Sequence, residues 1–215
     1  MIKVTAESLN KVCDQISQDR CRQLAEIMNK KIAQYGITDW DQFHEFVGQV
    51  AHESGEFSLK SEDMSYSAQR LAEVWPDTFS STHRKPYSPN GLAAMYAHKP
   101  VQLANFKYGG KYGNRPGTNS GWDFRGGGYI GITFYDNWKM YADYKKMEPL
   151  ACAEWVRTTD EGAMDSAFWF FYVFRHLGQL AIDDNDKEIT RRINGGFINY
   201  NDRIKYTERA RKYLN

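Results

Sequence analysis

The segment FHEFVGQVAHESG, residues 43–55, decides the fold of this chain, because it joins an amphipathic helix to an acidic residue near its end. Its apolar residues recur at the spacing of one helix face: Phe43, Phe46, Val47 and Val50. A start after Thr38 or Asp39 supplies an N-cap, and Gly55 supplies a stop. The pattern predicts a core helix with Glu53 at the edge of its buried face.

A second acidic cluster, Glu62 and Asp63, follows Gly55 in polar surroundings. Glu53 lies beside aromatic and aliphatic side chains, where an ionised carboxyl is poorly solvated, and this suits a general acid. Glu62 is expected to stay ionised and act as a base, with Asp63 as the alternative base. Cleavage of a glycosidic bond needs two carboxyl groups in such different environments. The competing interpretation is that both are ordinary surface acids, because carboxylate pairs are common.

The composition of the chain excludes several classes of protein. Its 215 residues are enough for one well-buried domain or two tightly packed lobes. The 28 basic and 27 acidic residues give a net charge of +1, so the overall charge does not favour nucleic acid. No apolar run reaches the length of a membrane span, and residues 1–7 lack the layout of a secretory signal. We therefore expect a globular protein without stable membrane insertion.

Neither a metal nor an organic cofactor is expected. Cys13, Cys21 and Cys152 form no disulfide framework and no CxxC pair, so reduced and partly buried thiols are expected. The five histidines include no HExxH pattern and no cysteine partner at metal spacing. Residues 126–131 fit GxGxxG, but no apolar strand precedes them, so a dinucleotide site is not indicated.

Two helices are predicted before residue 43. Thr5 can cap the first, whose apolar positions continue at helical spacing as far as Ile16. The second runs from about Ser17 and stops at Gly36.

The middle of the chain has a different character. Prolines are frequent between Ser80 and Gly131, and nine glycines lie between Gly109 and Gly131. These residues predict long loops with a small β-hairpin near Trp122–Thr133. Loops of this length inside a compact domain are usually functional.

Helices are predicted again after residue 158. Residues 158–161 form a capping box, and residues 164–177 are apolar nearly all round, which indicates a central buried helix closed by Gly178. Two short helices, at about Asp186–Asn194 and Asp202–Leu214, complete the chain. The basic residues of the last segment indicate a solvated face, or contact with an anionic polymer or membrane surface.

Taken together, these motifs resemble a known family. The chain resembles a bacteriophage endolysin of glycoside hydrolase family 19, a family that also contains plant-type chitinases. The matching segments follow the family's order and cover almost the whole chain: residues 36–38, 47–55, 62–68, 75–79, 112–115, 121–126, 190–196 and 202–203. Each match alone is modest evidence, whereas their order and spacing together are specific.

The resemblance implies a role for individual residues. Glu53 falls at the proton donor, Glu62 at the base that activates water, and Thr133 at a hydroxyl that helps to hold this water. Four residues fall at positions that line the sugar cleft: Tyr66, Arg125, Asn137 and Asn194. Arg191 and Arg192 are expected to orient the carboxylates. The family inverts the anomeric configuration, which implies carboxyl groups roughly 6.5–9.5 Å apart.

The resemblance also implies the architecture. The expected fold is mainly α and lysozyme-like, as a single catalytic domain over residues 1–215. A larger helical lobe and a smaller loop-rich lobe at about residues 80–135 are expected to border the cleft. No separate wall-binding domain is expected.

The implied activity is that of a lysozyme-type or muramidase-type endolysin, which hydrolyses β-1,4 bonds in peptidoglycan by an inverting two-carboxylate mechanism. Peptidoglycan glycan strands are the expected partner of a monomer that binds no nucleic acid. Because a signal segment is lacking, the enzyme is expected to wait in the host cytoplasm until lysis. A separate holin-type protein would then give it access to the cell wall in the periplasm.

Three alternatives stay open at this point. A chitinase of the same family would cut a related neutral glycan. A lytic transglycosylase needs one catalytic glutamate and no water, and the adjacent Glu53 and Ser54 are compatible with it. A non-catalytic module would only bind the wall.

Overall fold

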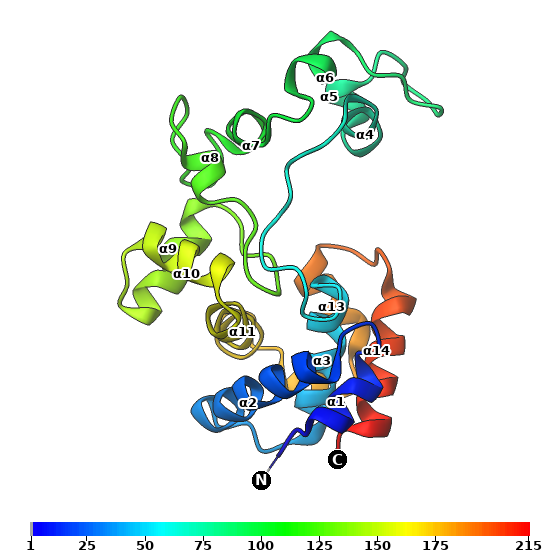
Figure 1. The fold of residues 1–215 in the computed structure, drawn as a ribbon, viewed down its shortest axis with the longest axis vertical. Coiled ribbons are helices and arrows are strands. Elements are labelled where there is room, and N and C mark those ends of the chain that lie inside the picture. The colour runs from blue at the N-terminus through cyan, green and yellow to red at the C-terminus, as the bar shows by residue number, and fades with distance from the viewer. Residues whose placement is uncertain (1) are drawn as a thin grey trace. The chain divides into compact units, whose positions relative to one another are not determined.

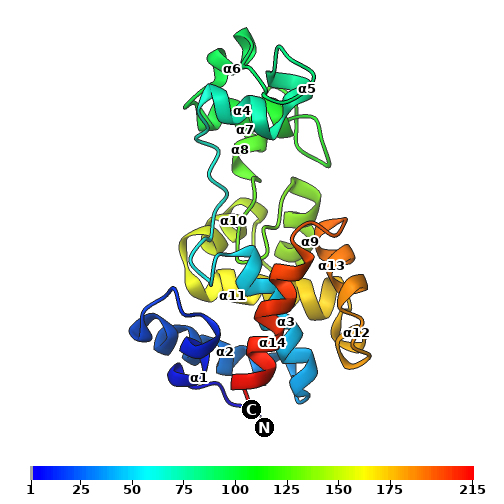
Figure 2. The ribbon, with the colours of Figure 1, turned by 90° about the vertical axis from the view of Figure 1, so that its right-hand side faces the viewer.

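The computed structural model describes residues 2–215, and the chain divides into two compact units (Figure 1 and Figure 2). Unit 1 contains the residues up to Lys60, the short segment Gly127–Gly131 and the segment Glu154–Asn215. Unit 2 contains Ser61–Gly126 and Ile132–Ala153. Helices dominate both units and residues 2–215 form no β-strand, which confirms the prediction of a mainly helical fold.

Unit 1 combines helices from both ends of the sequence. Its elements are α1 (Ala6–Val12), α2 (Gln18–Tyr35), α3 (Trp40–Glu53), α11 (Asp160–Phe168), the π-helical segment η1 (Trp169–Phe174), α12 (Gly178–Ile182), α13 (Asp186–Asn194) and α14 (Tyr200–Tyr213). Helices α3 and α14 lie side by side in both views. Helix α10 (Pro149–Thr158) carries the chain from unit 2 into unit 1.

The predicted starts of the first three helices are confirmed by their caps. In each case a side-chain oxygen accepts a hydrogen bond from a backbone N–H of the first turn: Thr5, Ser17 and Asp39. Helix α2 ends at Gly36, whose φ of 66° is left-handed, as a C-terminal glycine allows.

Helix α1 is shorter than predicted, since it ends at Val12 and not at Ile16. The reason is a side chain that competes with the helix. Asn10 Nδ2 donates to the carbonyl oxygens of Cys13 at 3.4 Å and Ile16 at 3.0 Å, and so satisfies the backbone of a turn.

The core of unit 1 is aromatic. The ring of Phe46 on α3 lies 4.2 Å from the ring of Phe168, centre to centre, and 5.7 Å from that of Phe171 in an edge-on arrangement. All three side chains are buried. Residues 164–177 are therefore central, as predicted.

Their backbone differs from the prediction of one continuous helix. Thr159, not Thr158, caps α11, because its Oγ1 accepts from the N–H of Gly162 at 3.0 Å. The helix then becomes π-helical over η1, and Gly178 begins α12 instead of closing the preceding helix. A run that is apolar on every side has no period from which this change could be recognised.

One glycine sets the distance between α3 and α14. Gly48 lies on α3 where Thr207 of α14 approaches, and a Cβ at Gly48 would lie 2.7 Å from Thr207 N and 2.8 Å from Thr207 Cα. Contact this close is available only to a residue without a side chain. The sequence of α3 thus provides both an apolar face for the core and a gap for α14.

Unit 2 is also helical. Its elements are α4 (Ala68–Val74), α5 (Pro76–Phe79), α6 (Gly91–Tyr96), α7 (Pro100–Tyr108), α8 (Ser120–Asp123) and α9 (Tyr135–Lys145). A small core of buried residues holds α4 to α7 together: Met64, Leu71, Phe79, Ala93, Leu103 and Ala104. Figure 1 shows α4, α5 and α6 close together.

The prediction of long loops over residues 80–131 is wrong for α6, α7 and α8. Pro100 occupies the first position of α7, where its fixed φ fits and no N–H is needed, so this proline begins a helix. Asn90 caps α6 through its side chain. The hairpin near Trp122–Thr133 does not form in the described chain, where Gly128 (φ 77°) and Gly131 (φ 69°) make turns.

The three cysteines, expected to be partly buried, are fully buried. Burial raises the pKa of the Cys13 and Cys21 thiols, which keeps them protonated. Within residues 2–215, no helix has the length and apolar character needed to cross a membrane.

The close approach at Gly48 gives a test of the packing. Gly48→Ala is expected to lower the free energy of unfolding by about 1–3 kcal/mol, because a Cβ there overlaps the backbone of Thr207. Helix propensity alone would favour alanine by about 1 kcal/mol, so the sign of the change is diagnostic. Urea unfolding measures it. Gly91→Ala is the control, since a Cβ at Gly91 meets nothing within 4 Å. An equal loss in both variants would contradict the packing argument.

Candidate active site

Glu53 is the last residue of α3, and a guanidinium from α14 holds its carboxyl group. Arg203 Nη2 donates to Glu53 Oε1 at 2.6 Å. The Arg203 side chain is 3% exposed and the Glu53 side chain 27% exposed. The cation is therefore buried, while the carboxyl group is fixed in place and still reaches solvent.

The backbone after Glu53 makes an unusual turn. Gly55, Glu56 and Phe57 all have left-handed φ values, of 55°, 58° and 60°. For the two residues with side chains this conformation costs roughly 1 kcal/mol or more each, so it persists only where the surroundings enforce it.

Side-chain hydrogen bonds enforce this turn. Ser54 Oγ accepts from the N–H of Phe57 at 2.8 Å. The buried carboxylate of Glu56 accepts from the N–H of Gln15 at 2.7 Å and from the hydroxyl of Tyr206 at 3.0 Å. Hydrogen bonds that involve Ser54, Gln15 and Tyr206 therefore hold the end of α3 and, with it, Glu53.

A buried polar chain supports Arg203 from behind. Arg203 Nη1 donates to Gln49 Oε1 at 3.1 Å. Gln49 Nε2 in turn donates to Thr190 Oγ1 at 3.3 Å and to Glu45 Oε2 at 3.5 Å. This chain connects α3, α13 and α14 beneath Glu53.

Glu45 ends this chain in an unfavourable environment for a charge. Its side chain is fully buried, and burial followed by the negative charge of Asp186 raises the pKa of Glu45 to about 8. Gln49 and Arg211 oppose this shift of the Glu45 pKa. Arg211 Nη2 lies 3.7 Å from Glu45 Oε1 and 3.8 Å from Asp186 Oδ1.

Arg191 and Arg192 on α13 both bind Glu188. Arg191 donates from Nε and Nη2 at 2.7 and 2.6 Å, and Arg192 donates from Nε at 2.8 Å. These bonds lower the pKa of Glu188 to about 2. At Glu53 the orienting guanidinium is that of Arg203, because α13 directs the two predicted arginines toward a carboxylate one turn earlier. Asn194 ends α13, is exposed, and donates to the carbonyl of Ile198 at 3.4 Å.

Glu62 belongs to unit 2, and both of its carboxylate oxygens accept hydrogen bonds. Tyr108 OH, at the end of α7, donates to Oε1 at 2.6 Å, and the N–H of Gly126 donates to Oε2 at 3.1 Å. Burial, followed by the charge of Glu62 and this hydrogen bond, raises the pKa of Tyr108. The phenol therefore stays a hydrogen-bond donor.

Thr133 lies beside Gly126, and Asn137 contacts Thr133. A Cβ at Gly126 would lie 3.1 Å from Glu62 Cβ and 3.4 Å from Thr133 Oγ1, so Glu62 and Thr133 both border the bare Gly126 backbone. Asn137 Nδ2 donates to the carbonyl of Thr133 at 2.8 Å. The structure thus brings three predicted residues together, while the role of Thr133 in holding water stays a prediction.

The backbone around Tyr108 and Thr133 is fixed by a buried amide. Asn114, only 3% exposed, donates to the carbonyl of Tyr108 at 3.1 Å and accepts from the N–H of Tyr135 at 3.0 Å. Phe134, between Thr133 and Tyr135, has a φ of 73°, which is strained for an aromatic residue. Such strain often accompanies functional sites.

Tyr66 and Arg125 also lie near Glu62. Burial and then the negative charge of Glu62 raise the pKa of the Tyr66 phenol. The Arg125 guanidinium stacks on the Trp122 ring at 3.5 Å, and its Nη1 donates to the carbonyl of Trp122 at 2.8 Å. Its buried Nε has no hydrogen-bond partner among residues 2–215.

Asp63, the alternative base, has a different environment. Its side chain is exposed and accepts from the N–H of Ser65 at 2.7 Å, which is a local turn contact. Glu62 is half-buried and held from α7 and from Gly126. This difference favours Glu62.

The two units hold their carboxyl groups in different ways. Unit 1 holds a carboxyl group through one oxygen, and unit 2 holds a carboxylate through both oxygens beside a hydroxyl, a phenol and a guanidinium. Within residues 2–215, no group of three or more histidine, cysteine or acidic side chains could hold a metal ion.

Sequence reasoning assigned no role to Arg203, Tyr108, Gln49 or Asn114. The segment that contains Arg203 was recognisable only as part of a family-like motif. No sequence pattern distinguishes Tyr108 from the other tyrosines among the 14 in the chain, because its contact with Glu62 depends on the path of α7.

Comparisons with known proteins concern the family and the fold of the chain. No model of a protein family matches the chain. A curated protein of Haemophilus influenzae, described as a glycosyl hydrolase family 19 domain-containing protein, is 31% identical over 184 residues, which is 84% of this chain and 84% of that protein. A crystal structure of a chitinase C mutant matches with a TM-score of 0.58 and 15% identity, over 97% of this chain and 91% of that one. The latter likeness concerns the fold and confirms the lysozyme-like, mainly α prediction.

The contact between Tyr108 and Glu62 yields a first test. Tyr108→Phe is expected to lower kcat for cleavage of a glycan at least about tenfold, because a hydrogen bond to a charged group is worth roughly 1.5–3 kcal/mol. The aromatic contact with Phe134 is retained, with ring centres at 5.3 Å, so the fold should survive. Steady-state kinetics measure the effect. Tyr87→Phe in the same unit is the matched control, and equal kcat in both variants would argue against the contact.

The raised pKa of Glu45 yields a second test, on stability. Above about pH 4.5 the unfolded chain releases the Glu45 proton, whereas the folded chain keeps it until about pH 8. Stability due to this group is therefore full below pH 4.5 and is lost as pH rises to 8, by at most about 1.4 kcal/mol per unit. Urea unfolding across this range should show the slope in the wild type and less of it in Glu45→Gln. The exposed Glu26→Gln should keep it, and a wild-type slope in Glu45→Gln would refute the assignment.

Proposed function

This chain belongs to glycoside hydrolase family 19, and from that membership we propose that it is a bacteriophage endolysin that hydrolyses β-1,4 bonds of peptidoglycan. Hydrolysis of glycosidic bonds follows from the family. The peptidoglycan substrate, the muramidase-type specificity and the role in host lysis are the proposal. The observation that carries it is the different way in which the two carboxyl groups are held, Glu53 through one oxygen and Glu62 through both.

Glu53 is proposed as the general acid. Arg203 contacts Oε1, so Oε2 can carry a proton and deliver it to the glycosidic oxygen as the bond to the anomeric carbon breaks. The rigid turn at residues 54–57 keeps this oxygen in position. A fixed donor lowers the entropic cost of reaching the transition state.

Glu62 is proposed as the base. A water attacks the anomeric carbon from the opposite face and gives its proton to Glu62, which inverts the configuration. Tyr108 and Gly126 orient the carboxylate, and Thr133 is proposed to hold the water beside it. Exchange of protons with solvent then returns Glu53 to its acid form and Glu62 to its ionised form.

The proposed sugar contacts are near Glu62 and at the end of α13. Tyr66 and Arg125 are the two near Glu62. Asn137 acts through the backbone of Thr133. Asn194, at the exposed end of α13, is proposed as a sugar contact in unit 1, with Arg191 and Arg192 close by in sequence.

The biological setting is part of the same proposal. We propose a monomer that acts on peptidoglycan glycan strands, remains in the host cytoplasm until lysis, and reaches the periplasmic wall when a holin-type protein opens the inner membrane. It binds neither nucleic acid nor cofactor in this scheme. A chitinase is the second candidate, since the solved structure with a similar fold is a chitinase C mutant.

Digestion of purified peptidoglycan tests the function. Reducing-end sugars without a 1,6-anhydro ring are expected, because water is the nucleophile. A 1,6-anhydro end would establish a lytic transglycosylase instead. Faster cleavage of chitin oligomers than of peptidoglycan would make the enzyme a chitinase.

In the same assay, Glu53→Gln and Glu62→Gln are each expected to lower kcat at least ~10²-fold. Glutamine at position 53 keeps an oxygen for Arg203, and at position 62 the Tyr108 hydroxyl can reverse its hydrogen bond, so both variants should fold. Asp63→Asn is the control and is expected to stay within about twofold of the wild type. If Asp63→Asn is inactive and Glu62→Gln is not, Asp63 is the base. If the wild type binds peptidoglycan but does not cleave it, the protein is a wall-binding module.

A further inference from the structure

Charge is distributed unevenly along this chain. Between Asp77 and Asp123 there is no acidic residue, although the whole chain has 27. The same stretch contains six basic residues: Arg84, Lys85, Lys99, Lys107, Lys111 and Arg115. The net charge of +1 therefore conceals a strongly basic part of unit 2.

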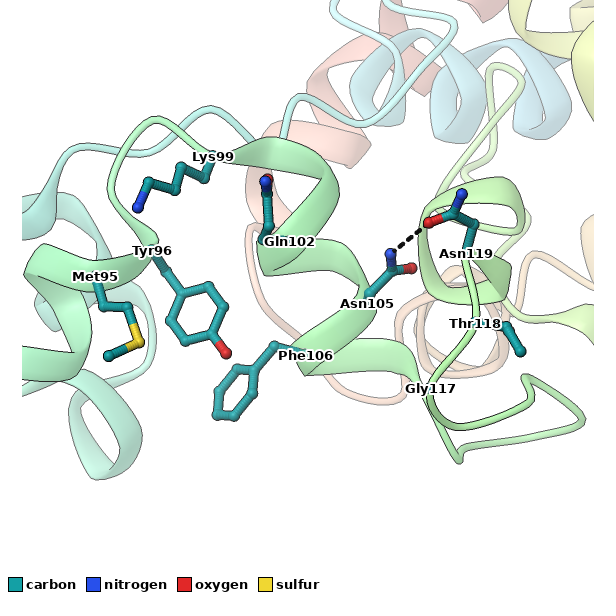
Figure 3. Close-up of a pocket in the computed structure, with 9 residues that line it drawn as sticks. All are labelled: Met95, Tyr96, Lys99, Gln102, Asn105, Phe106, Gly117, Thr118 and Asn119. Atoms are coloured by element: carbon teal, nitrogen blue, oxygen red, sulfur yellow. Dashed lines mark hydrogen bonds between the residues drawn. The ribbon is translucent and has the colours of Figure 1, made fainter.

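An open hollow of about 760 Å³ lies within this basic stretch (Figure 3). One end of it is apolar. The rings of Tyr96 and Phe106 stack with centres 4.7 Å apart, and Met95 lies beside them. Phe106 is 43% exposed and Met95 59% exposed, so an apolar platform faces solvent.

The rest of the hollow is polar. Asn105 Nδ2 donates to Asn119 Oδ1 at 3.1 Å, shown as a dashed line in Figure 3. Lys99 and Gln102 complete this side, and neither side chain has a hydrogen bond or ion pair with another residue in the range 2–215. The hollow thus offers the amide of Gln102 and the ammonium group of Lys99 to a ligand.

Helix α7 connects this hollow to the surroundings of Glu62. Helix α7 contributes Gln102, Asn105 and Phe106 to the hollow and ends in Tyr108, which binds Glu62. At 1.5 Å per residue, Gln102 is about 9 Å from Tyr108 along the helix. Asn105 Oδ1 also accepts from the N–H of Trp122 at 2.9 Å, the residue on which Arg125 stacks.

We propose that the hollow binds the acidic stem peptide that branches from a peptidoglycan strand next to the cleaved bond. The inference rests on the proposed function and specifies its substrate. Lys99 pairs with a carboxylate of the stem, the side-chain amides of Asn119 and Gln102 bond its backbone, and the Tyr96–Phe106 platform takes an apolar side chain. An extended peptide spans about 3.3–3.6 Å per residue, so about three residues cover the length of α7 between Gln102 and Tyr108.

Charge distinguishes this ligand from a neutral glycan. Chitin carries no carboxylates, and a site for it gains nothing from the exposed cation of Lys99. Aromatic platforms with amides serve sugars as well as peptides, but an unpaired lysine is complementary to an anion. The hollow therefore makes the enzyme selective for strands that still carry their stems.

The test compares two forms of one substrate. Purified peptidoglycan strands are used intact, or after an amidase has removed the stem peptides, and KM and kcat are measured for reducing-end release at low salt. A lower KM for intact strands is expected. The difference should shrink as salt is raised, because it depends on screened charge.

Substitutions at Lys99 locate the effect. Lys99→Gln is expected to raise KM for intact strands about three- to fivefold and Lys99→Glu about tenfold or more, with smaller changes on stripped strands. Lys99→Arg should restore most of the affinity. Lys30→Gln, an exposed lysine of α2 in unit 1, is the charge-matched control and should behave as wild type on both substrates. Thermal unfolding confirms that each variant folds.

A binding experiment keeps this inference separate from the proposed function. Soluble stem tetrapeptide is titrated into the wild-type protein, and the side-chain amides of Asn105 and Asn119 are followed by NMR. Shifts in these amides that Lys99→Glu abolishes are expected, whether or not the protein cleaves peptidoglycan. Three results would overturn stem binding while leaving glycan hydrolysis intact. These are the absence of such shifts, an equal KM for intact and stripped strands, and amide shifts of equal size on addition of inorganic phosphate. Failure to cleave either strand would overturn the proposed function instead.

Discussion

The contact between α3 and α14 is the constraint on which the rest of unit 1 depends. Gly48 removes the side chain that would keep the two helices apart, and Arg203 can then reach Glu53 at 2.6 Å. The guanidinium is buried, and the Glu53 carboxyl group and the Gln49 amide oxygen each accept a hydrogen bond from it. Packing and chemistry are therefore decided by the same few residues. A helix placed 1 Å further out would lose both.

Unit 2 positions its carboxylate by a different principle. Glu62 accepts neutral donors, a phenol from the end of α7 and a backbone N–H, and has no buried ion pair of its own. These donors are kept in place by Asn114 and by a strained Phe134, so local backbone geometry does the work that a guanidinium does in unit 1. Helix α7 links this carboxylate to the basic hollow. Helix α7 thus contributes both to the proposed binding of the stem peptide and to the orientation of Glu62.

The sequence predicts the structure well where apolar residues recur at helical spacing or a polar residue caps the start of a helix. The starts of α1, α2 and α3 follow from Thr5, Ser17 and Asp39, since short polar side chains at helix starts have a direct physical role. The failures have equally physical causes. The run after residue 164 is apolar on every side and hides its π-helical turn, and Pro100 begins a helix that composition alone would deny. Partners such as Arg203 depend on contacts far apart in sequence, which no local pattern encodes.

The ion pair between Glu53 and Arg203 joins positions 150 residues apart. During synthesis, α3 leaves the ribosome long before α14 has been translated, so the growing polypeptide carries an acid without its guanidinium. Unit 1 also needs α11 and α13, which are made late as well. Any activity that requires the completed pair can begin only after position 203 has emerged. An activity that requires this pair is therefore absent from nascent chains and from chains truncated before position 203.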